Sequence, residues 1–165
     1  MKTIFYSIAF VFILTSCATK MVTKFPAEVK MMTTKQFETD YELIFKSTIS
    51  LLQSESYIVE RADKETGLIN ASKRIENKNA AMQRFLVGTS KDANTSKVMF
   101  YIEPINEDIT EVKITLYEGA ETTTNGSWGT RNKQSNELMI YEPLVYQEWF
   151  RSLQAELERR KALIN

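Results

Sequence analysis

The sequence of 165 residues contains no histidine and only one cysteine, Cys17. One cysteine cannot form a disulfide within the chain, and the usual Cys/His zinc site lacks its ligands. Nucleophiles activated by histidine are excluded as well. Basic and acidic side chains balance at 21 each, so the net charge gives no reason to expect a nucleic-acid partner. With few glycines and prolines and 43% hydrophobic residues, the composition is typical of one folded domain.

The first seventeen residues have the features of a bacterial export signal. Lys2 precedes an uncharged apolar run over residues 4–14, which is too short for a membrane span of roughly 20 residues but suits a signal peptide. The run ends in Leu14-Thr15-Ser16-Cys17, which resembles the lipobox of bacterial prolipoproteins. The resemblance implies that residues 1–16 are removed and that Cys17 is lipidated, with the membrane as partner through this N-terminal lipid. A buried helix with a structural cysteine is the alternative.

The residue after the cysteine bears on location. Ala18 stands where an aspartate favours inner-membrane retention in enterobacterial lipoproteins. We therefore expect an outer-membrane, periplasm-facing lipoprotein of the bacterial cell envelope, with the inner membrane as the alternative. Residues 17–33 sustain neither a helical nor a strand period, so we expect a lipidated tether there, followed by a single domain over residues 34–165. Residues 29–32 could instead form a short edge strand.

Apolar periodicity predicts the elements of this domain. One helix ends at Ser54 and begins near Thr34 or Asp40, because two capping boxes compete, Thr33 with Gln36 and Thr39 with Glu42. A second, long helix covers residues 143–163, and strands are expected at 57–61, 68–73, 98–103 and 109–118. Residues 74–97 are interpreted as an insertion, with a short helix at 80–87 and a polar loop after it. Asn125-Gly126 predicts a two-residue hairpin turn, or a flexible loop.

The predicted fold is α+β, a four-stranded antiparallel meander sheet flanked by an N-terminal and a long C-terminal helix. This order, with the segments Tyr57-Ile58-Val59, Asp63 to Gly67 and Leu68-Ile69, is similar to helix-grip domains of outer-membrane accessory lipoproteins of the barrel-assembly type. The likeness implies a helix-grip-like shape and an envelope protein as partner.

Two aromatic groups outside the expected core are candidate partner contacts. Trp128 lies in a polar stretch with Gly126 and Gly129, where it could anchor a partner protein or a sugar ring, or fold back as a lid over the core. Phe85, in the insertion, poses the same alternatives. No catalytic residue, cofactor or metal site is predicted, because the acidic cluster at residues 103–111 lacks EF-hand spacing and the glycines form no phosphate loop.

The sequence therefore favours a non-enzymatic, lipid-anchored protein-interaction or accessory module. The alternative is a carrier of small apolar ligands, or an envelope enzyme, with a cleft between the sheet and the C-terminal helix. A filled core would favour the first interpretation, and a large cavity lined by aromatic residues would favour the second.

Overall fold

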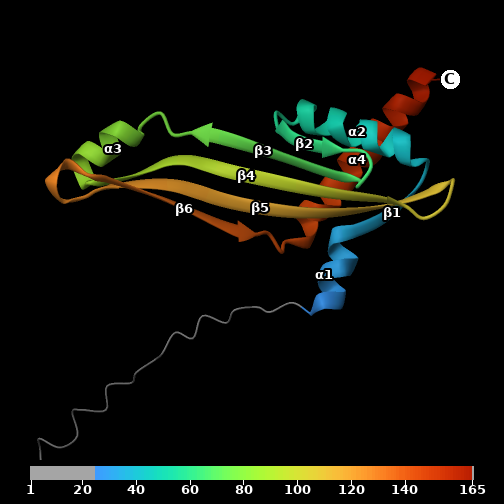
Figure 1. Ribbon diagram of the computed structural model, residues 1–165, viewed down its shortest axis with the longest axis horizontal. Helices are drawn as coiled ribbons and strands as arrows, with labels where there is room; N and C mark the ends of the chain where they lie inside the picture. The colour runs from blue at the N-terminus through green and yellow to red at the C-terminus, as the bar shows by residue number, and fades with distance from the viewer. Residues whose placement is uncertain (1–24, 165) are drawn as a thin grey trace, which may run out of the picture.

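The computed structural model describes residues 25–164, which form a long antiparallel sheet with helices against part of it (Figure 1). The predicted signal peptide and Cys17 lie outside these residues. The helices are α1 (Pro26–Thr33), α2 (Tyr41–Ser54), α3 (Ala80–Val87) and α4 (Pro143–Ile164), with a 3-10 turn η1 (Ser127–Gly129). The strands are β1 (Thr34–Glu38), β2 (Ile58–Asp63), β3 (Leu68–Glu76), β4 (Thr89–Pro104), β5 (Ile109–Asn125) and β6 (Arg131–Met139). The α+β class, the antiparallel sheet and the long C-terminal helix are confirmed.

The prediction of four strands was wrong, since the described part of the chain has six. Strands β2 to β6 follow one another as a meander. β1 and β6 both pair with the same edge of β5, β1 with its first residues and β6 with its last. Both missed strands are polar: β1 buries Phe37 alone, and β6 is exposed along nearly all its length. A strand held mainly by its ladder of backbone hydrogen bonds leaves no alternating apolar pattern to detect.

The insertion predicted at residues 74–97 is largely sheet. β3 runs on to Glu76, and β4 already begins at Thr89, so the expected polar loop is the first half of a long strand. The short helix at 80–87 is confirmed as α3. The hairpin after β5 exists, but its loop spans residues 126–130 and includes η1, so the two-residue turn was wrong.

The N-terminal boundary also differs from the expectation. Residues 26–33, which we placed in the tether, form α1, so residues 29–32 are helical and not an edge strand. α2 begins at Tyr41, because the Asp40 side chain accepts a hydrogen bond of 2.9 Å from the backbone N–H of Leu43. This N-cap takes the place of both capping boxes considered from the sequence.

The core lies between one face of the sheet and the helices α2 and α4. Along β4 and β5, alternate residues point into it, and the amphipathic stripes of the two helices cover them. Its largest fully buried side chains include Phe100, Ile114, Leu52, Tyr146 and Leu153. We call this covered part of the sheet the proximal half. The ends of β3, β4 and β5 that extend beyond α2 and α4, together with α3 and the β5–β6 hairpin, are the distal half (Figure 1).

Candidate functional site

Helix α3 at the distal end buries none of its residues. Gly88 ends it in a left-handed conformation, with φ of 76°, and donates its N–H to the Arg84 carbonyl at 3.0 Å. Four large apolar side chains of this short helix are exposed, with Phe85 the most at 88%. They are Met82, Phe85, Leu86 and Val87. Helix α3 therefore contributes nothing to the core, and its apolar residues face solvent.

A polar network attaches α3 to the sheet. The Arg84 guanidinium donates to Asp92 Oδ1 at 2.6 Å and to Ser90 Oγ at 3.0 Å, and Ser90 Oγ donates to the same carboxylate at 2.6 Å. Thr123 Oγ1 of β5 donates to the other carboxylate oxygen. Because side chains alternate along β5, Thr123 lies on the opposite face from the core residue Ile114. The network therefore holds α3 on the face of the sheet that α2 and α4 do not cover.

The carboxylate of Asp92 is the centre of this network. The hydroxyl hydrogen bonds from Ser90 and Thr123, and then the guanidinium of Arg84, lower the pKa of Asp92 to about 2. Ser90 and Thr123 are themselves buried. Asp92 therefore stays ionised at neutral pH, and charge-assisted hydrogen bonds fix the position of α3.

Trp128 is held at the tip of the β5–β6 hairpin. Its φ is 63°, a left-handed conformation that is uncommon for a bulky residue, and its side chain is fully exposed. The loop closes through a hydrogen bond of 2.8 Å from the Gly126 N–H to the Thr130 carbonyl. Full exposure contradicts the interpretation of Trp128 as a lid over the core.

The two candidate contact residues come from distant parts of the sequence, and the elements that carry them, α3 and the β5–β6 hairpin, lie at the same end of the molecule (Figure 1). The backbone N–H of Asn125 donates to the Gly88 carbonyl at 2.7 Å, which joins the hairpin to the end of α3. We call the exposed residues of this end the distal apolar cluster. It consists of Met82, Phe85, Leu86, Val87 and Trp128.

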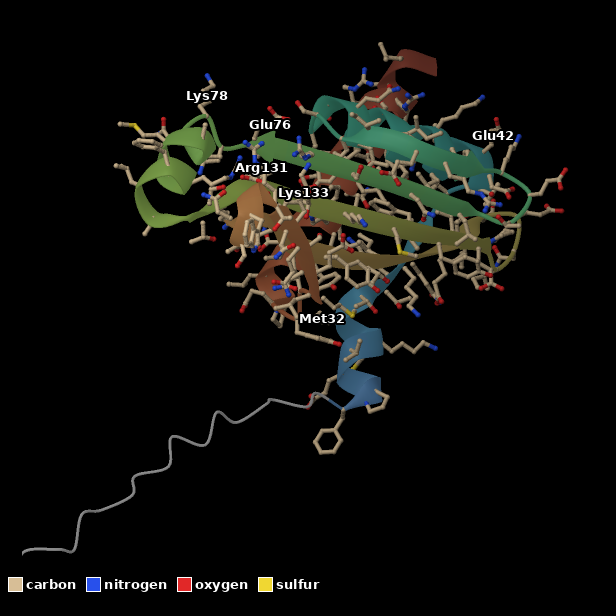
Figure 2. The ribbon with its side chains drawn as sticks, turned by 60° about the vertical axis from the view of Figure 1, so that its left-hand side comes forward. Met32, Glu42, Glu76, Lys78, Arg131 and Lys133 are labelled. Atoms are coloured by element: carbon tan, nitrogen blue, oxygen red, sulfur yellow. The ribbon has the colours of Figure 1, made fainter. Side chains whose placement is uncertain are left out.

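Positive charges lie toward the same end of the molecule. Figure 2 shows Lys78, Arg131 and Lys133 at the end of the molecule that carries α3. Within residues 25–164, neither Lys78 nor Arg131 forms an ion pair, whereas nearby Glu76 is paired with Arg74. Glu121 and Asp92 are likewise paired, with Arg74 and Arg84, so Lys78 and Arg131 are cations without an ion-pair partner among these residues.

The interface between the sheet and α4 is filled by side chains. Trp149 packs edge-on against Tyr57 and Phe100, with ring centroids 5.6 and 5.9 Å apart. Tyr146 is fully buried and donates its hydroxyl to the Ile140 carbonyl at 2.8 Å, and burial raises the pKa of this phenol. These rings occupy the space beneath the middle of α4, and an open pocket of about 300 Å³ with Tyr57 and Trp149 in its lining lies at their edge.

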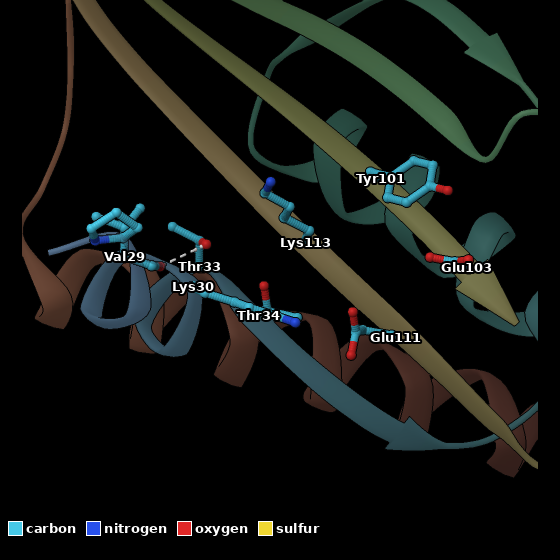
Figure 3. Close-up of a pocket in the computed structure, with 9 residues that line it drawn as sticks. Val29, Lys30, Thr33, Thr34, Tyr101, Glu103, Glu111 and Lys113 are labelled. Atoms are coloured by element: carbon cyan, nitrogen blue, oxygen red, sulfur yellow. Dashed lines mark hydrogen bonds between the residues drawn. The ribbon is translucent and has the colours of Figure 1, made fainter. Parts of the chain in front are cut away.

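A cavity of about 500 Å³ lies elsewhere, between α1 and the open face of the sheet (Figure 3). Glu103 and Glu111 lie opposite each other in the β4–β5 register and line it with Tyr101 and Lys113. The described residues include no group of three or more carboxylate, thiol or imidazole side chains that could hold a metal ion. The lining gives no indication of a particular reaction.

Sequence reasoning missed the polar network. Arg84 and Asp92 are eight residues apart, but Thr123 is supplied by another strand 31 residues beyond Asp92. No local pattern marks such a set. The exposure of Met82 was equally hidden, because an amphipathic helix normally buries its apolar stripe, whereas the group Phe85-Leu86-Val87 was considered as a possible contact from the sequence.

No protein-family model matches this sequence, and a search of curated proteins also finds no match. Among the helices of residues 25–164, none has both the length and the apolarity that crossing a membrane requires.

Proposed function

We propose that this protein is a non-enzymatic, lipid-anchored module of the bacterial cell envelope that binds a partner protein through its distal end. The observation that carries the proposal is the distal apolar cluster, five large apolar side chains exposed at one end of a sheet whose core is filled elsewhere. Soluble proteins rarely leave such residues together in solvent without an interaction that uses them.

The way in which the cluster is held supports binding. The Asp92 network and the Asn125–Gly88 hydrogen bond position α3 and the hairpin before any partner arrives. A preorganised surface loses less conformational entropy on binding than a mobile one. Trp128 and Arg131 are also of the residue types that dominate binding energies at protein interfaces.

The charges around the cluster indicate the chemistry of the partner. Lys78 and Arg131 have no ion pair among the described residues. The pKa of Glu121 is lowered mainly by its hydrogen bond from Arg74 and also by the charge of nearby Lys133. A complementary surface therefore has an apolar recess for Trp128 and Phe85, bordered by acidic side chains.

The envelope location rests on the N-terminal sequence. The order of Lys2, apolar run and Leu14-Thr15-Ser16-Cys17 supports export and lipidation, and Ala18 supports the outer membrane. Stable anchoring needs more than one acyl chain, which lipidation of both the thiol and the new amino group provides. The long C-terminal helix against an antiparallel sheet is in keeping with a helix-grip-like accessory lipoprotein.

The anchor is tested by replacing Cys17 with serine. We expect the Cys17→Ser variant to remain an uncleaved, unacylated precursor, whereas the neighbouring Thr19→Ser control is processed normally. Intact-mass spectrometry of both proteins distinguishes these forms. Normal processing of Cys17→Ser, or an unmodified Cys17 in the native protein, would contradict the proposal.

The binding role is tested by affinity purification of the detergent-extracted, full-length protein. We expect one envelope protein in stoichiometric amount, and its recovery should fall about tenfold or more in a Phe85→Ala/Trp128→Ala variant. Ile105→Ala is the matched control, because Ile105 is also exposed but lies in the turn between β4 and β5. Repeated recovery of the protein alone, or a complex unaffected by the double substitution, counts against the proposal.

A further inference from the structure

The lateral edges of the sheet differ in how well they are protected against pairing with another strand. β1 is only five residues long, and its Phe37 ring is buried next to Phe150. β2 is interrupted by a register shift between Val59 and Arg61. Short edges and bulges both discourage further pairing. β6 has neither protection: its nine residues lack proline, and its register with β5 is continuous from Met139 to Arg131.

The backbone of β6 presents a regular set of unpaired groups. The Ile140 N–H donates to the Leu116 carbonyl, and the Gly126 N–H donates to the Thr130 carbonyl. In an antiparallel ladder the hydrogen-bonded pairs alternate, so even-numbered residues of β6 bond to β5. The N–H and C=O groups of Lys133, Ser135 and Glu137 therefore point outward, away from the sheet.

The charges of β6 are self-complementary about Ser135. A second β6 strand, antiparallel and related by a two-fold axis at Ser135, places Lys133 of each copy opposite Glu137 of the other. Opposite charges in such cross-strand pairs stabilise pairing, whereas like charges oppose it. With the axis at Ser135, the outward backbone N–H and C=O groups of β6 also lie opposite the corresponding groups of the second copy and can form hydrogen bonds with them. In the single chain, Glu137 already accepts a hydrogen bond of 2.7 Å from Lys97 on β4, and a carboxylate has room for a second donor.

We propose that a second copy of this chain pairs with β6 in antiparallel orientation, with the two-fold axis at Ser135, so that the sheets of two molecules become continuous. This goes beyond the proposed function and requires neither the distal apolar cluster nor the lipid. Such an isologous contact closes on itself and leaves no further β6 edge exposed.

The register is tested by single cysteines introduced into the full-length protein. A hydrogen-bonded pair has Cα atoms about 5.5 Å apart, within the range of a disulfide, so Ser135→Cys should form a covalent dimer under mild oxidation. Gln134→Cys and Asn136→Cys are matched controls: each would lie diagonally from its counterpart, at about 7–8 Å, and should stay largely monomeric. The parent with Cys17 alone gives the background. Absence of a dimer for all three, or equal dimer yields, would overturn the proposal.

The charge pairing has its own test in the Ser135→Cys background. Lys133→Glu and Glu137→Lys each place like charges opposite each other in a dimer, so each alone should lower the yield of cross-linked dimer several-fold. Mixing the two variants restores opposite charges at both positions, so the mixed dimer should form preferentially. Thermal unfolding of each variant checks that the fold survives, particularly where Glu137→Lys removes the partner of Lys97. A mixture that cross-links no better than the separate variants would refute the pairing.

Discussion

The two halves of the sheet are stabilised by different means. In the proximal half, apolar side chains of β4 and β5 are buried beneath α2 and α4, with Phe100 and Ile114 inaccessible to solvent. In the distal half, α3 is attached by hydroxyl, carboxylate and guanidinium groups, and its large apolar side chains stay exposed. Burial of apolar area contributes the larger part of the free energy of folding, whereas hydrogen bonds fix the relative orientation of the groups that they join.

Under the proposed function, this difference would let one chain be stable and also bind a partner. Because the proximal core provides the stability, the distal half can leave its apolar residues for a partner. Because the Asp92 network consists of polar contacts, it holds α3 in place while the Phe85 side chain stays exposed. The four substitutions below test this division, from the largest expected effect to the smallest.

A cavity in the proximal core should cause the largest loss. Phe100→Ala removes a fully buried ring that contacts Trp149, and we expect it to lower the free energy of unfolding by about 3–5 kcal/mol. Tyr101→Ala, one residue along on the open face, is the control and should cost much less. Chemical denaturation measures both. Equal losses for the two would show that α2 and α4 do not define the stabilising face.

A buried hydrogen bond in the proximal half should contribute less to the free energy of unfolding than the apolar side chains around it. Tyr146→Phe removes the hydroxyl that donates to the Ile140 carbonyl at 2.8 Å, with an expected loss of about 1–2 kcal/mol. The half-exposed Tyr101→Phe serves as the control, with almost no effect. If Tyr146→Phe destabilised the protein as much as Phe100→Ala does, the dominance of apolar burial in this half would be refuted.

The distal network should respond to pH through Asp92. Its folded-state pKa of about 2 lies below the ordinary value near 4, so its contribution is complete above pH 4 and is lost as the pH falls through 2. Asp92→Asn should remove this pH dependence and raise amide hydrogen-exchange rates several-fold around Ser90 and Thr123, with little change in the core.

The measurement is the difference between the parent and Asp92→Asn, followed residue by residue with NMR. Glu121, whose pKa is lowered mainly by hydrogen bonding to Arg74 and raised by the nearby charge of Asp92, titrates in both proteins and at a lower pH in Asp92→Asn, so its own signal is followed separately. The same acid response in both proteins, or exchange rising first around Phe100, would contradict a separate distal unit held by Asp92.

The distal apolar cluster should contribute least to stability. Trp128 is fully exposed, so Trp128→Ala should change the free energy of unfolding by no more than about 0.5 kcal/mol. Trp149→Ala offers the contrast within the same protein, because that ring packs against Tyr57 and Phe100 and its removal should be clearly destabilising. A large loss with Trp128→Ala would mean that its role is structural.

The parts of the fold visible from sequence are those that bury apolar stripes. Tyr146, Phe150, Leu153 and Leu157 repeat with helical spacing, and α4 follows the prediction closely. Val112, Ile114 and Leu116 alternate, and β5 was recognised from them. Hydrophobic periodicity reports burial on one face, and it predicts an element only where such burial occurs.

The elements that were missed lack this signal. The nine residues of β6 are polar almost throughout, and the first half of β4 reads as a loop, because in both cases backbone pairing with β5 decides the structure. Phe85 and Trp128 were identified as candidates, but their meeting at one end depends on the length of β5, which carries the hairpin back to α3. Long-range pairing of this kind is not encoded in any local window.

Site-specific photo-crosslinking in living cells tests the distal contact most directly. A photoreactive amino acid is introduced singly at Phe85, at Trp128 and, as the matched exposed control, at Ile105. The account predicts that the two distal positions cross-link to the same envelope protein and that Ile105 does not. Equal cross-linking from all three positions, or a partner captured from Ile105 alone, would contradict the assignment of the distal end as the binding surface.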